Sequence, residues 1–356
     1  MSGGVDSSVT AALIKDLKYD VFGITMQIWP SNENAEDTER FGGCCSLGAV
    51  ADAKKVAFKI GIPHYVLNFR KVFEKKVINN FCQEYLAGRT PNPCVRCNEH
   101  IKFGVLLKKA RELEADFIAT GHYARIERKN GKFRLKKGVD ARKDQSYVLY
   151  MMKQDNLRRI LMPLGNLTKN ETRKIAKNLG LTVAEKEESQ EICFVSGGNY
   201  GEFLKEYLDK LPQPGPILSL GGEIVGKHRG LIFYTVGQRR GLGISGGEPL
   251  YIIAIDKERN ALVVGPEDKT YSTQFRVEQV SYVDKPVTAP TKLKVKIRYQ
   301  SEEREALVTP FEGSKALVEL DTPEKAVTPG QTCVFYKSEI VVGGGTISSS
   351  NHSQPS

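Results

Sequence analysis

The amino-acid sequence predicts an α/β domain built on a parallel sheet, followed by a small central domain and a C-terminal β-barrel. Up to about residue 120, short apolar segments alternate with amphipathic helical segments, as in parallel α/β sheets. After prolines at 212, 214 and 216, the pattern changes to short β segments separated by glycine turns. We therefore predict domains at 1–205, 206–270 and 271–342, and a disordered, Gly/Ser/Asn-rich tail at 343–356.

In the first domain, we expect strands at 20–28, 64–68 and 116–120, and helices at 46–60, 72–86 and 103–113. An earlier helix follows residue 5, since Val9, Ala12 and Leu13 fall on one face. Ligands in such sheets bind at the carboxyl ends of the strands. Met26 and Gly121 are therefore expected to line the same crevice as the opening segment of the chain.

Further along, 143–182 predicts more helix, including one that begins at Thr168 with a capping box to Glu171. Short strands are expected at 223–225, 250–256 and 261–264, and several more between 275 and 342. The segment 291–299 alternates basic and apolar residues, which predicts a strand with one basic face. That face is either a solvated barrel surface or a row of cations along a phosphate backbone.

Net charge, the length of apolar runs and the number of cysteines indicate the kind of partner and the cellular compartment. The formal net charge is +10 and the pI is about 9.1, which favours a polyanionic partner. No apolar run is long enough for a membrane span or a signal peptide, so we expect no membrane association. Because the sequence shows no secretory signal, its seven cysteines indicate a reducing compartment, the cytoplasm, and not a disulfide framework. Cys82 and Cys333 have apolar neighbours and are expected in the core, whereas Cys44 and Cys45 are ambiguous.

The opening segment, residues 2–8, reads SGGVDSS. Two glycines flanked by hydroxyl side chains, running into a helix N-terminus, form a natural binding site for phosphate. No Gly-Lys-Ser/Thr follows, so this is not a Walker loop. The segment instead resembles the SGGxDS motif of the PP-loop ATP pyrophosphatases, which implies binding of ATP with Mg²⁺, adenylation of a carbonyl oxygen and release of pyrophosphate.

Two separate cysteines are candidates for reactive thiols. Pro91 and Pro93 are expected to keep 92–98 (NPCVRCN) out of a helix and on the surface, so that solvent reaches Cys97. Arg96 beside it would favour the thiolate, which is the reactive form. Cys193 lies in SQEICF, directly after an acidic run at 185–188 that we expect to be a mobile loop. Their separation in the sequence leaves open whether the two thiols meet.

Six motifs occur in this order: SGGVDSS, NPCVRCN, GHYA at 121–124, KDQS at 143–146, SQEICFV and GQRRG at 237–241. Together, over nearly the whole chain, they resemble the bacterial tRNA-specific 2-thiouridylases. The resemblance implies ATP-dependent adenylation of the 2-position oxygen of the wobble uridine in tRNA. A cysteine persulfide, loaded by a sulfur-donor protein, then delivers sulfur to that carbon with loss of AMP.

Roles follow from the resemblance residue by residue. Cys193 would carry the persulfide, and Cys97 would help to release its sulfur, which two approaching thiols achieve by forming a disulfide. The implied ATP contacts are Ser2, Gly3, Gly4, Val5, Asp6, Ser7, Met26 and Gly121. The implied base contacts are Asn92, Pro93 and Cys94, and the implied tRNA contacts are His122, Lys143, Asp144, Gln145, Arg298, Tyr299 and Gln331.

One residue departs from the family pattern, because Cys94 occupies a position that is often Asp. Three interpretations follow. The substitution is neutral and the persulfide relay is intact, or Cys94, Cys97 and Cys193 hold a 4Fe-4S cluster whose open iron carries the sulfur. In the third, a zinc site recruits a fourth ligand from Cys44 or Cys45.

Two functions of other classes also deserve comparison. A PP-loop amidating synthetase acting on a small carbonyl substrate needs the same opening loop but has no use for Cys97 and Cys193. A non-enzymatic RNA-binding protein would explain a basic barrel but not the ATP loop.

A last expectation concerns the strand that normally precedes a phosphate loop. Here only Met1 stands before the loop. We expect a natural chain that starts several residues earlier, with an apolar strand whose absence would weaken folding and ATP binding.

Overall fold

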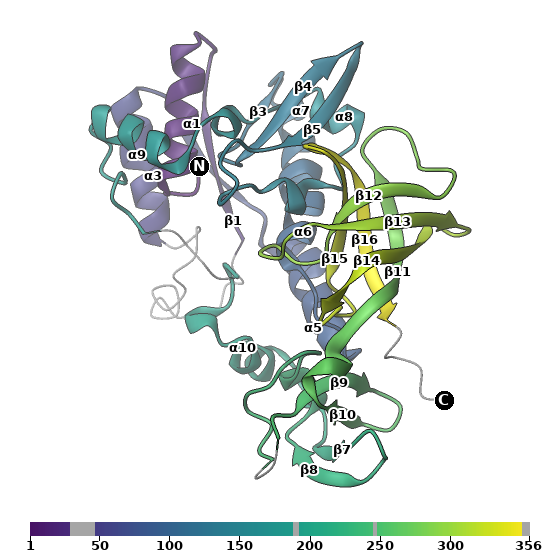
Figure 1. The fold of residues 1–356 in the computed structure, drawn as a ribbon. Helices are drawn as coiled ribbons and strands as arrows, with labels where there is room; N and C mark the ends of the chain where they lie inside the picture. Colours follow the sequence, from purple (N-terminus) through teal and green to yellow (C-terminus); the bar gives the residue numbers. More distant parts are fainter. Residues whose placement is uncertain (29–46, 188–191, 245–247, 351–356) are drawn as a thin grey trace. The chain divides into compact units, whose positions relative to one another are not determined.

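We analysed a computed structural model of the chain, which describes residues 1–28, 47–187, 192–244 and 248–350. Cys44, Cys45, the end of the acidic run and residues 351–356 of the predicted tail lie outside these ranges. The chain forms two compact units (Figure 1). The first comprises Met1–Ile78, Pro93–Tyr200 and Glu339–Val341, and the second comprises Asn79–Asn92, Gly201–Ser338 and the chain from Val342. None of the described helices is long and apolar enough to cross a membrane.

The first unit contains two pairs of parallel strands, which confirms the predicted α/β class. β1 (Gly23–Gln27) pairs in parallel with β2 (His64–Asn68), and β3 (Ile118–Ala119) with β6 (Ile160–Leu161). Helices α1 (Val5–Asp16) and α3 (Leu47–Ile60) bury apolar side chains against this layer, with Val9 and Val56 in a common core. The predicted strand at 116–120 is only two residues long.

The remaining elements of the first unit surround that layer. β4 (Ala124–Lys129) and β5 (Lys132–Lys137) form an antiparallel hairpin. The short helical elements are η3 (Ser146–Leu149), α8 (Gln154–Leu157), η4 (Pro163–Asn166) and η5 (Ser196–Gly198). α9 (Lys169–Asn178) begins where predicted, because Thr168 and Glu171 form the expected capping box.

Two predicted helices differ in extent from those observed. The one at 72–86 divides into α4 (Arg70–Phe73), the wider π-type turns of η1 (Glu74–Ile78) and α5 (Asn79–Leu86). The one at 103–113 begins ten residues earlier, as α6 (Pro93–Arg96), continues through the π-type η2 (Cys97–Leu106) and ends with α7 (Leu107–Glu112). The expectation that prolines exclude a helix from 92–98 is therefore wrong. Proline is well tolerated at the first position of a helix, and Pro93 occupies that position.

The second unit holds a small mixed sheet and the barrel. After α10 (Tyr200–Tyr207), four strands form a sheet in the order β8-β7-β10-β9. Their bounds are β7 (Gly215–Leu218), β8 (Ile224–His228), β9 (Tyr251–Asp256) and β10 (Ala261–Gly265). Two short 3-10 helices accompany them: η6 (Leu231–Phe233) follows β8, and η7 (Glu267–Thr270) follows β10.

Six strands then form the barrel, which closes because β11 pairs with both β14 and β16. They are β11 (Tyr271–Tyr282), β12 (Thr291–Lys296), β13 (Arg304–Phe311), β14 (Lys315–Lys325), β15 (Thr332–Lys337) and β16 (Ile340–Ser350). The predicted disordered tail is thus wrong for 343–350: these small residues pair with β11, where glycines allow close approach of the backbones.

Both cysteines expected in the core are buried there. Cys333 on β15 is fully buried in the barrel and Cys82 on α5 is 3% exposed. Burial in apolar surroundings raises the pKa of the Cys82 thiol to about 12 and raises that of Cys333 further. Both thiols therefore stay protonated and unreactive at neutral pH.

Candidate active site

The opening loop is compact because its backbone turns where a side chain would not fit. Gly3 has a φ of +67°, and a Cβ there would lie 2.2 Å from the carbonyl oxygen of Ala49. The hydroxyl of Ser7 accepts a hydrogen bond from the Ser2 N–H at 3.1 Å and donates one to the Gly4 carbonyl at 3.2 Å. The loop is thus closed on itself at the N-terminus of α1, the position that suits a phosphate.

Gly121, predicted to join this loop from the end of β3, does so. A Cβ at Gly121 would lie 2.9 Å from both the backbone carbon and the Cβ of Asp6. Only a glycine allows this approach, so Gly121 and the opening loop form a cradle at the N-terminus of α1, where the motif implies that ATP binds. Met26, the other predicted contact, is half-buried in the carboxyl-terminal half of β1, opposite Leu67 of β2.

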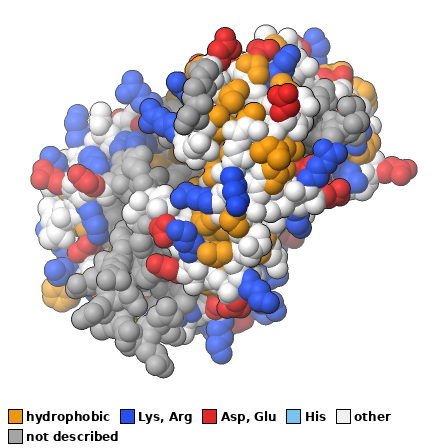
Figure 2. All heavy atoms as spheres, turned by 90° about the horizontal axis from the view of Figure 1, so that it is seen from below, with side chains coloured by type: hydrophobic (Ala, Val, Ile, Leu, Met, Phe, Trp, Pro, Cys, Tyr) orange, Lys and Arg blue, Asp and Glu red, His pale blue; other side chains and the backbone are white. Residues whose placement is uncertain are grey.

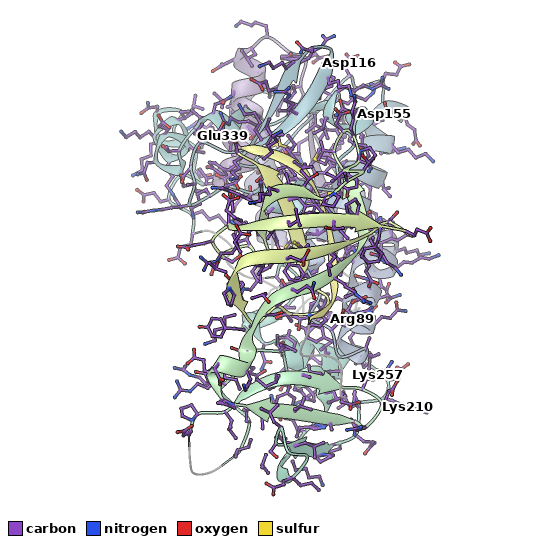
Figure 3. The ribbon with its side chains drawn as sticks, turned by 45° about the vertical axis from the view of Figure 1, so that its right-hand side comes forward. Arg89, Asp116, Asp155, Lys210, Lys257 and Glu339 are labelled. Carbon is purple, nitrogen blue, oxygen red and sulfur yellow. The ribbon has the colours of Figure 1, made fainter. Side chains whose placement is uncertain are left out.

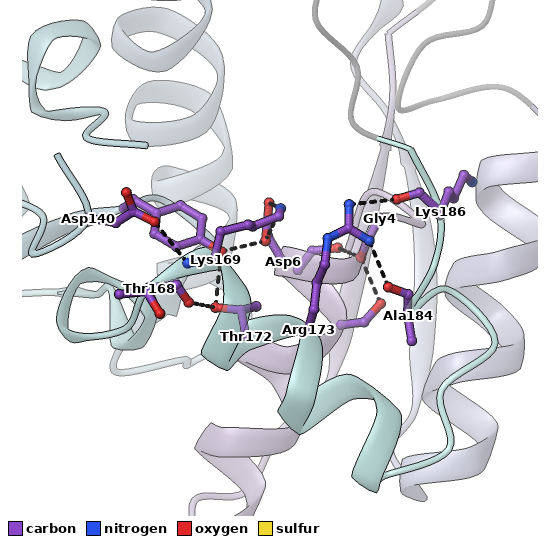
Figure 4. A network of polar contacts seen from close by, with 12 residues as sticks. Gly4, Asp6, Asp140, Thr168, Lys169, Thr172, Arg173, Ala184 and Lys186 are labelled. Atoms are coloured by element: carbon purple, nitrogen blue, oxygen red, sulfur yellow. Dashed lines mark hydrogen bonds and ion pairs between the residues drawn. The ribbon is translucent and has the colours of Figure 1, made fainter. Parts of the chain in front are cut away.

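Asp6 lies at the centre of a polar network that the sequence does not reveal (Figure 4). The Lys169 ammonium lies 2.7 and 2.9 Å from the two Asp6 carboxylate oxygens, although only 9% of the lysine side chain is exposed. The Tyr123 hydroxyl lies 2.9 Å from Asp6 Oδ1 and 3.0 Å from the hydroxyl of Thr172. The buried Lys169 ammonium is therefore held beside the phosphate loop by Asp6, a carboxylate of that loop.

A second lysine supports the loop from the chain that follows α9. The Lys186 ammonium donates to the Gly3 carbonyl at 3.1 Å and pairs with Asp52 at 2.7 Å. Arg173 donates to the carbonyls of Ala184 and Lys186, which fixes this segment onto α9 (Figure 4). The loop is therefore contacted from two sides, by Lys186 from the segment after α9 and by Gly121 from the segment after β3.

Cys94 and Cys97 lie on α6 and at the start of η2. Cys94 is exposed and Cys97 is partly exposed, as the sequence predicted for a reachable thiol. Arg96, expected to favour the Cys97 thiolate, forms an ion pair with Glu99 at 3.1 Å, which partly offsets its charge. Asn98 is buried and donates from Nδ2 to the Val148 carbonyl at 3.1 Å, which fixes the turn that carries Cys97.

Cys193 is partly exposed and is positioned by its neighbour. The ring of Phe194 is buried and packs edge-on against Phe73 of α4, with ring centroids 5.7 Å apart. α4 packs against η2, the element that begins with Cys97. The two thiols thus lie on segments that share α4 as a neighbour.

The structure bears on the iron–sulfur interpretation, whereas the zinc interpretation needs Cys44 or Cys45, which lie outside the described residues. Within the residues it describes, no group of three His, Cys, Asp or Glu side chains is close enough to hold a metal ion. Cys94, Cys97 and Cys193 all lie within that part of the chain, so their arrangement here does not fit a 4Fe-4S cluster.

The whole sequence matches known proteins along its length. Three family models match in order: tRNA methyl transferase HUP domain over residues 1–197, tRNA methyl transferase PRC-barrel domain over 201–266 and Aminomethyltransferase beta-barrel domain over 272–347. The chain is 53% identical over 352 residues to the tRNA-specific 2-thiouridylase MnmA of Acetivibrio thermocellus, covering 98% of this chain and 97% of that protein. The chain belongs to the tRNA-specific 2-thiouridylase family.

Other members of the 2-thiouridylase family show the same extent of similarity. Those of Heliobacterium modesticaldum and Halothermothrix orenii are each 53% identical and cover 98% of this chain. The alignments cover 91% and 97% of those two proteins, respectively. The similarity thus includes the barrel as well as the ATP loop, in agreement with the resemblance that the motifs indicate.

Among the tRNA contacts that the 2-thiouridylase resemblance implies, two are buried. His122 accepts or donates at 2.9 Å with the Thr120 hydroxyl, and burial lowers the pKa of its imidazole well below the usual value, which keeps it neutral at pH 7. Asp144 accepts from the Gly138 N–H at 3.0 Å and from Ser146. These side chains shape the loop around half-buried Lys143 and Gln145, and direct contact with tRNA stays a prediction for each of the four.

In the second unit, the implied tRNA contacts are already engaged in hydrogen bonds. Arg298 and Arg304 both bind the buried carboxylate of Glu324, at 3.1 and 2.6 Å. Gln331 donates to the Thr90 carbonyl at 2.9 Å, two residues before Asn92, which is half-buried. Tyr299 is 39% exposed, and the Lys296 ammonium lies 5.8 Å from the centroid of its ring.

Proposed function

We propose that this chain catalyses the ATP-dependent 2-thiolation of the wobble uridine of tRNA, as a sulfurtransferase. The observation that carries the proposal is the cradle formed where Gly121 packs against Asp6, in a chain related to 2-thiouridylases over 98% of its length. An amidating synthetase needs only that cradle and leaves the match through both C-terminal domains unexplained.

In the first step, the uridine O2 attacks the α-phosphorus of ATP, the bond to the β-phosphate breaks, and pyrophosphate leaves. The N–H groups of the loop bind phosphate oxygens, and the Lys169 ammonium stabilises the charge that develops on the leaving pyrophosphate. Asp6 would hold Mg²⁺, which would neutralise part of the phosphate charge. The phosphates of ATP would then compete with the Asp6 carboxylate for the Lys169 ammonium.

In the second step, the outer sulfur of a Cys193 persulfide attacks C2 of the uridine, the C2–O2 bond breaks, and O2 leaves as part of AMP. The Cys97 thiolate then attacks the Cys193 Sγ, the S–S bond breaks, and 2-thiouridine is released. The two cysteines end as a disulfide, which a two-electron thiol reductant must reopen before a persulfide-bearing donor protein reloads Cys193. The base must leave its stack to reach these groups.

The test of this function is release of pyrophosphate from ATP. We expect release that depends on added tRNA carrying uridine at the wobble position, together with 2-thiouridine once a persulfide donor is supplied. The same tRNA with cytidine at that position is the control and should give neither product. Pyrophosphate release that is independent of tRNA, or that requires ammonia, would contradict the proposal and support a synthetase.

The basic face of β12 gives a prediction about tRNA affinity. Leu293 and Val295 are buried, whereas Lys294 is exposed and lies 3.5 Å from Glu305 in a weak surface pair. If this face follows phosphates, the double variant Lys294→Ala/Lys296→Ala should bind tRNA more weakly. The slope of log affinity against log salt should fall by about two. An unchanged slope would make this face an ordinary solvated barrel surface.

A further inference from the structure

The hairpin of β4 and β5 carries a basic face that no motif identifies. Directly opposed residues of an antiparallel pair point to the same side of the sheet. One side of this hairpin is formed by three cross-strand pairs: Arg125 with Lys136, Glu127 with Arg134, and Lys129 with Lys132. Five of these six side chains are cations. We refer to this set of six residues as the hairpin's basic face.

The opposite side of the hairpin is fixed in the first unit. Leu135 is fully buried there, with Ile126 opposite it. The Gln154 side chain accepts from the backbone N–H of Phe133 at 2.9 Å and donates to its carbonyl at 2.8 Å. Because this opposite side is packed at Leu135 and hydrogen-bonded at Phe133, the basic face is held in one orientation.

Charge on the basic face increases toward the tip of the hairpin. Glu339, labelled in Figure 3, lies 3.1 Å from Arg125 and 3.4 Å from Lys136, and so offsets the cations at the base. Five cations against the two carboxylates Glu127 and Glu339 leave a net charge of +3. By contrast, cationic, acidic and hydrophobic side chains are intermixed on the face drawn in Figure 2.

The hairpin is hydrogen-bonded at both ends to the segment 143–145, for which the family resemblance implies tRNA contact. Just before β4, the backbone of Tyr123 exchanges two hydrogen bonds with Gln145, at 3.0 and 2.9 Å. Just after β5, the Gly138 N–H donates to Asp144 at 3.0 Å. Through its hydroxyl, Tyr123 also reaches Asp6 of the ATP loop. The base of the hairpin is therefore linked, through Tyr123, to the ATP loop where the proposed adenylation takes place.

We infer that the hairpin's basic face binds the phosphate backbone of the tRNA substrate, an inference that rests on the proposed function. Alternate residues of a strand lie about 6.6 Å apart, so successive cations can each reach a different phosphate. Backbone binding of this kind carries no sequence specificity and instead positions the RNA, so that one nucleotide enters the site.

The test uses the half of the hairpin nearer the tip, where Lys129 in the last pair and Arg134 opposite Glu127 lie outside the proposed catalytic machinery. We expect Lys129→Ala/Arg134→Ala to weaken tRNA binding at least tenfold near 0.15 M salt and to lower the salt slope by about two. KM for tRNA should rise while kcat at saturating tRNA and the thermal shift caused by ATP stay unchanged. The charge-conserving variant Lys129→Arg/Arg134→Lys should bind as the wild type does.

The matched control is Lys108→Ala/Arg111→Ala, which removes two exposed cations from α7 of the same unit. Equal tRNA binding by the tip variant and this control would overturn the inference. So would a tip variant that binds tRNA normally but accepts sulfur poorly from a persulfide donor protein, because the face would then belong to a protein partner. Wild-type protein that binds no tRNA would instead refute the proposed function itself.

Discussion

Substituting Cys193 by serine should abolish 2-thiouridine formation but leave adenylation of tRNA detectable. Adenylation needs only the ATP loop and the uridine oxygen, whereas sulfur delivery needs a sulfur that can carry a persulfide. We expect thiolation below about one part in 10³ of wild type, the scale on which loss of a nucleophile acts. The measurement is mass spectrometry of digested tRNA for 2-thiouridine, with pyrophosphate release followed in the same reactions.

Cys97→Ser should also block turnover, but at a later point. Persulfide on Cys193 should still form, and the tRNA should accumulate as a mixed disulfide that an added thiol releases. Cys82→Ser on α5 is the matched control, because that thiol is buried and protonated. Normal thiolation by Cys193→Ser would assign the sulfur carrier to another residue.

Cys94 distinguishes the persulfide relay from iron–sulfur chemistry. Cys94→Asp removes one of the three thiols that a cluster would need. Activity that persists in this variant without iron would support the relay, in agreement with the absence of a three-ligand group among the described residues. Loss of activity that returns only on reconstitution with iron and sulfide would support a cluster.

Much of the fold follows from local pattern. The strand at 64–68 and the capping box at Thr168 were predictable from a few adjacent residues, because apolar runs and caps act over one or two turns. The opening loop and Gly121 were likewise predictable as partners, because carboxyl ends of parallel strands meet at one edge of a sheet.

The departures have specific physical causes. Pro93 predicts a break in the helix, but it stands at the first helical position, where the missing N–H of proline removes no hydrogen bond. Residues 343–350 have the composition of a disordered segment, and only pairing with β11 makes them a strand. The ion pair of Asp6 with Lys169 joins residues 163 positions apart, so no local pattern contains it.

Lys169→Met should reduce adenylation of tRNA by about 10²–10³-fold, the usual cost of removing one donor that stabilises a transition-state charge. The buried ammonium lies within 3 Å of Asp6, at the loop where pyrophosphate forms and leaves. Methionine keeps the length and apolar stem of lysine, so packing around Tyr123 should be preserved while the charge is lost. The measurement is single-turnover pyrophosphate release at saturating ATP and tRNA.

Two further variants separate charge from folding. Lys174→Met, an exposed lysine on the same helix, should leave the rate within about threefold of wild type, as surface substitutions usually do. In Asp6→Asn/Lys169→Met both charges are gone, so the partly buried Asp6 carboxylate is not left without its cation, and the thermal stability should exceed that of Lys169→Met alone. It should nevertheless remain inactive. Transfer of a persulfide from the donor protein to Cys193 should be normal in all three variants, since it does not use ATP. Adenylation by Lys169→Met at the rate of Lys174→Met would show that the ammonium only stabilises the loop and does not act on the phosphates.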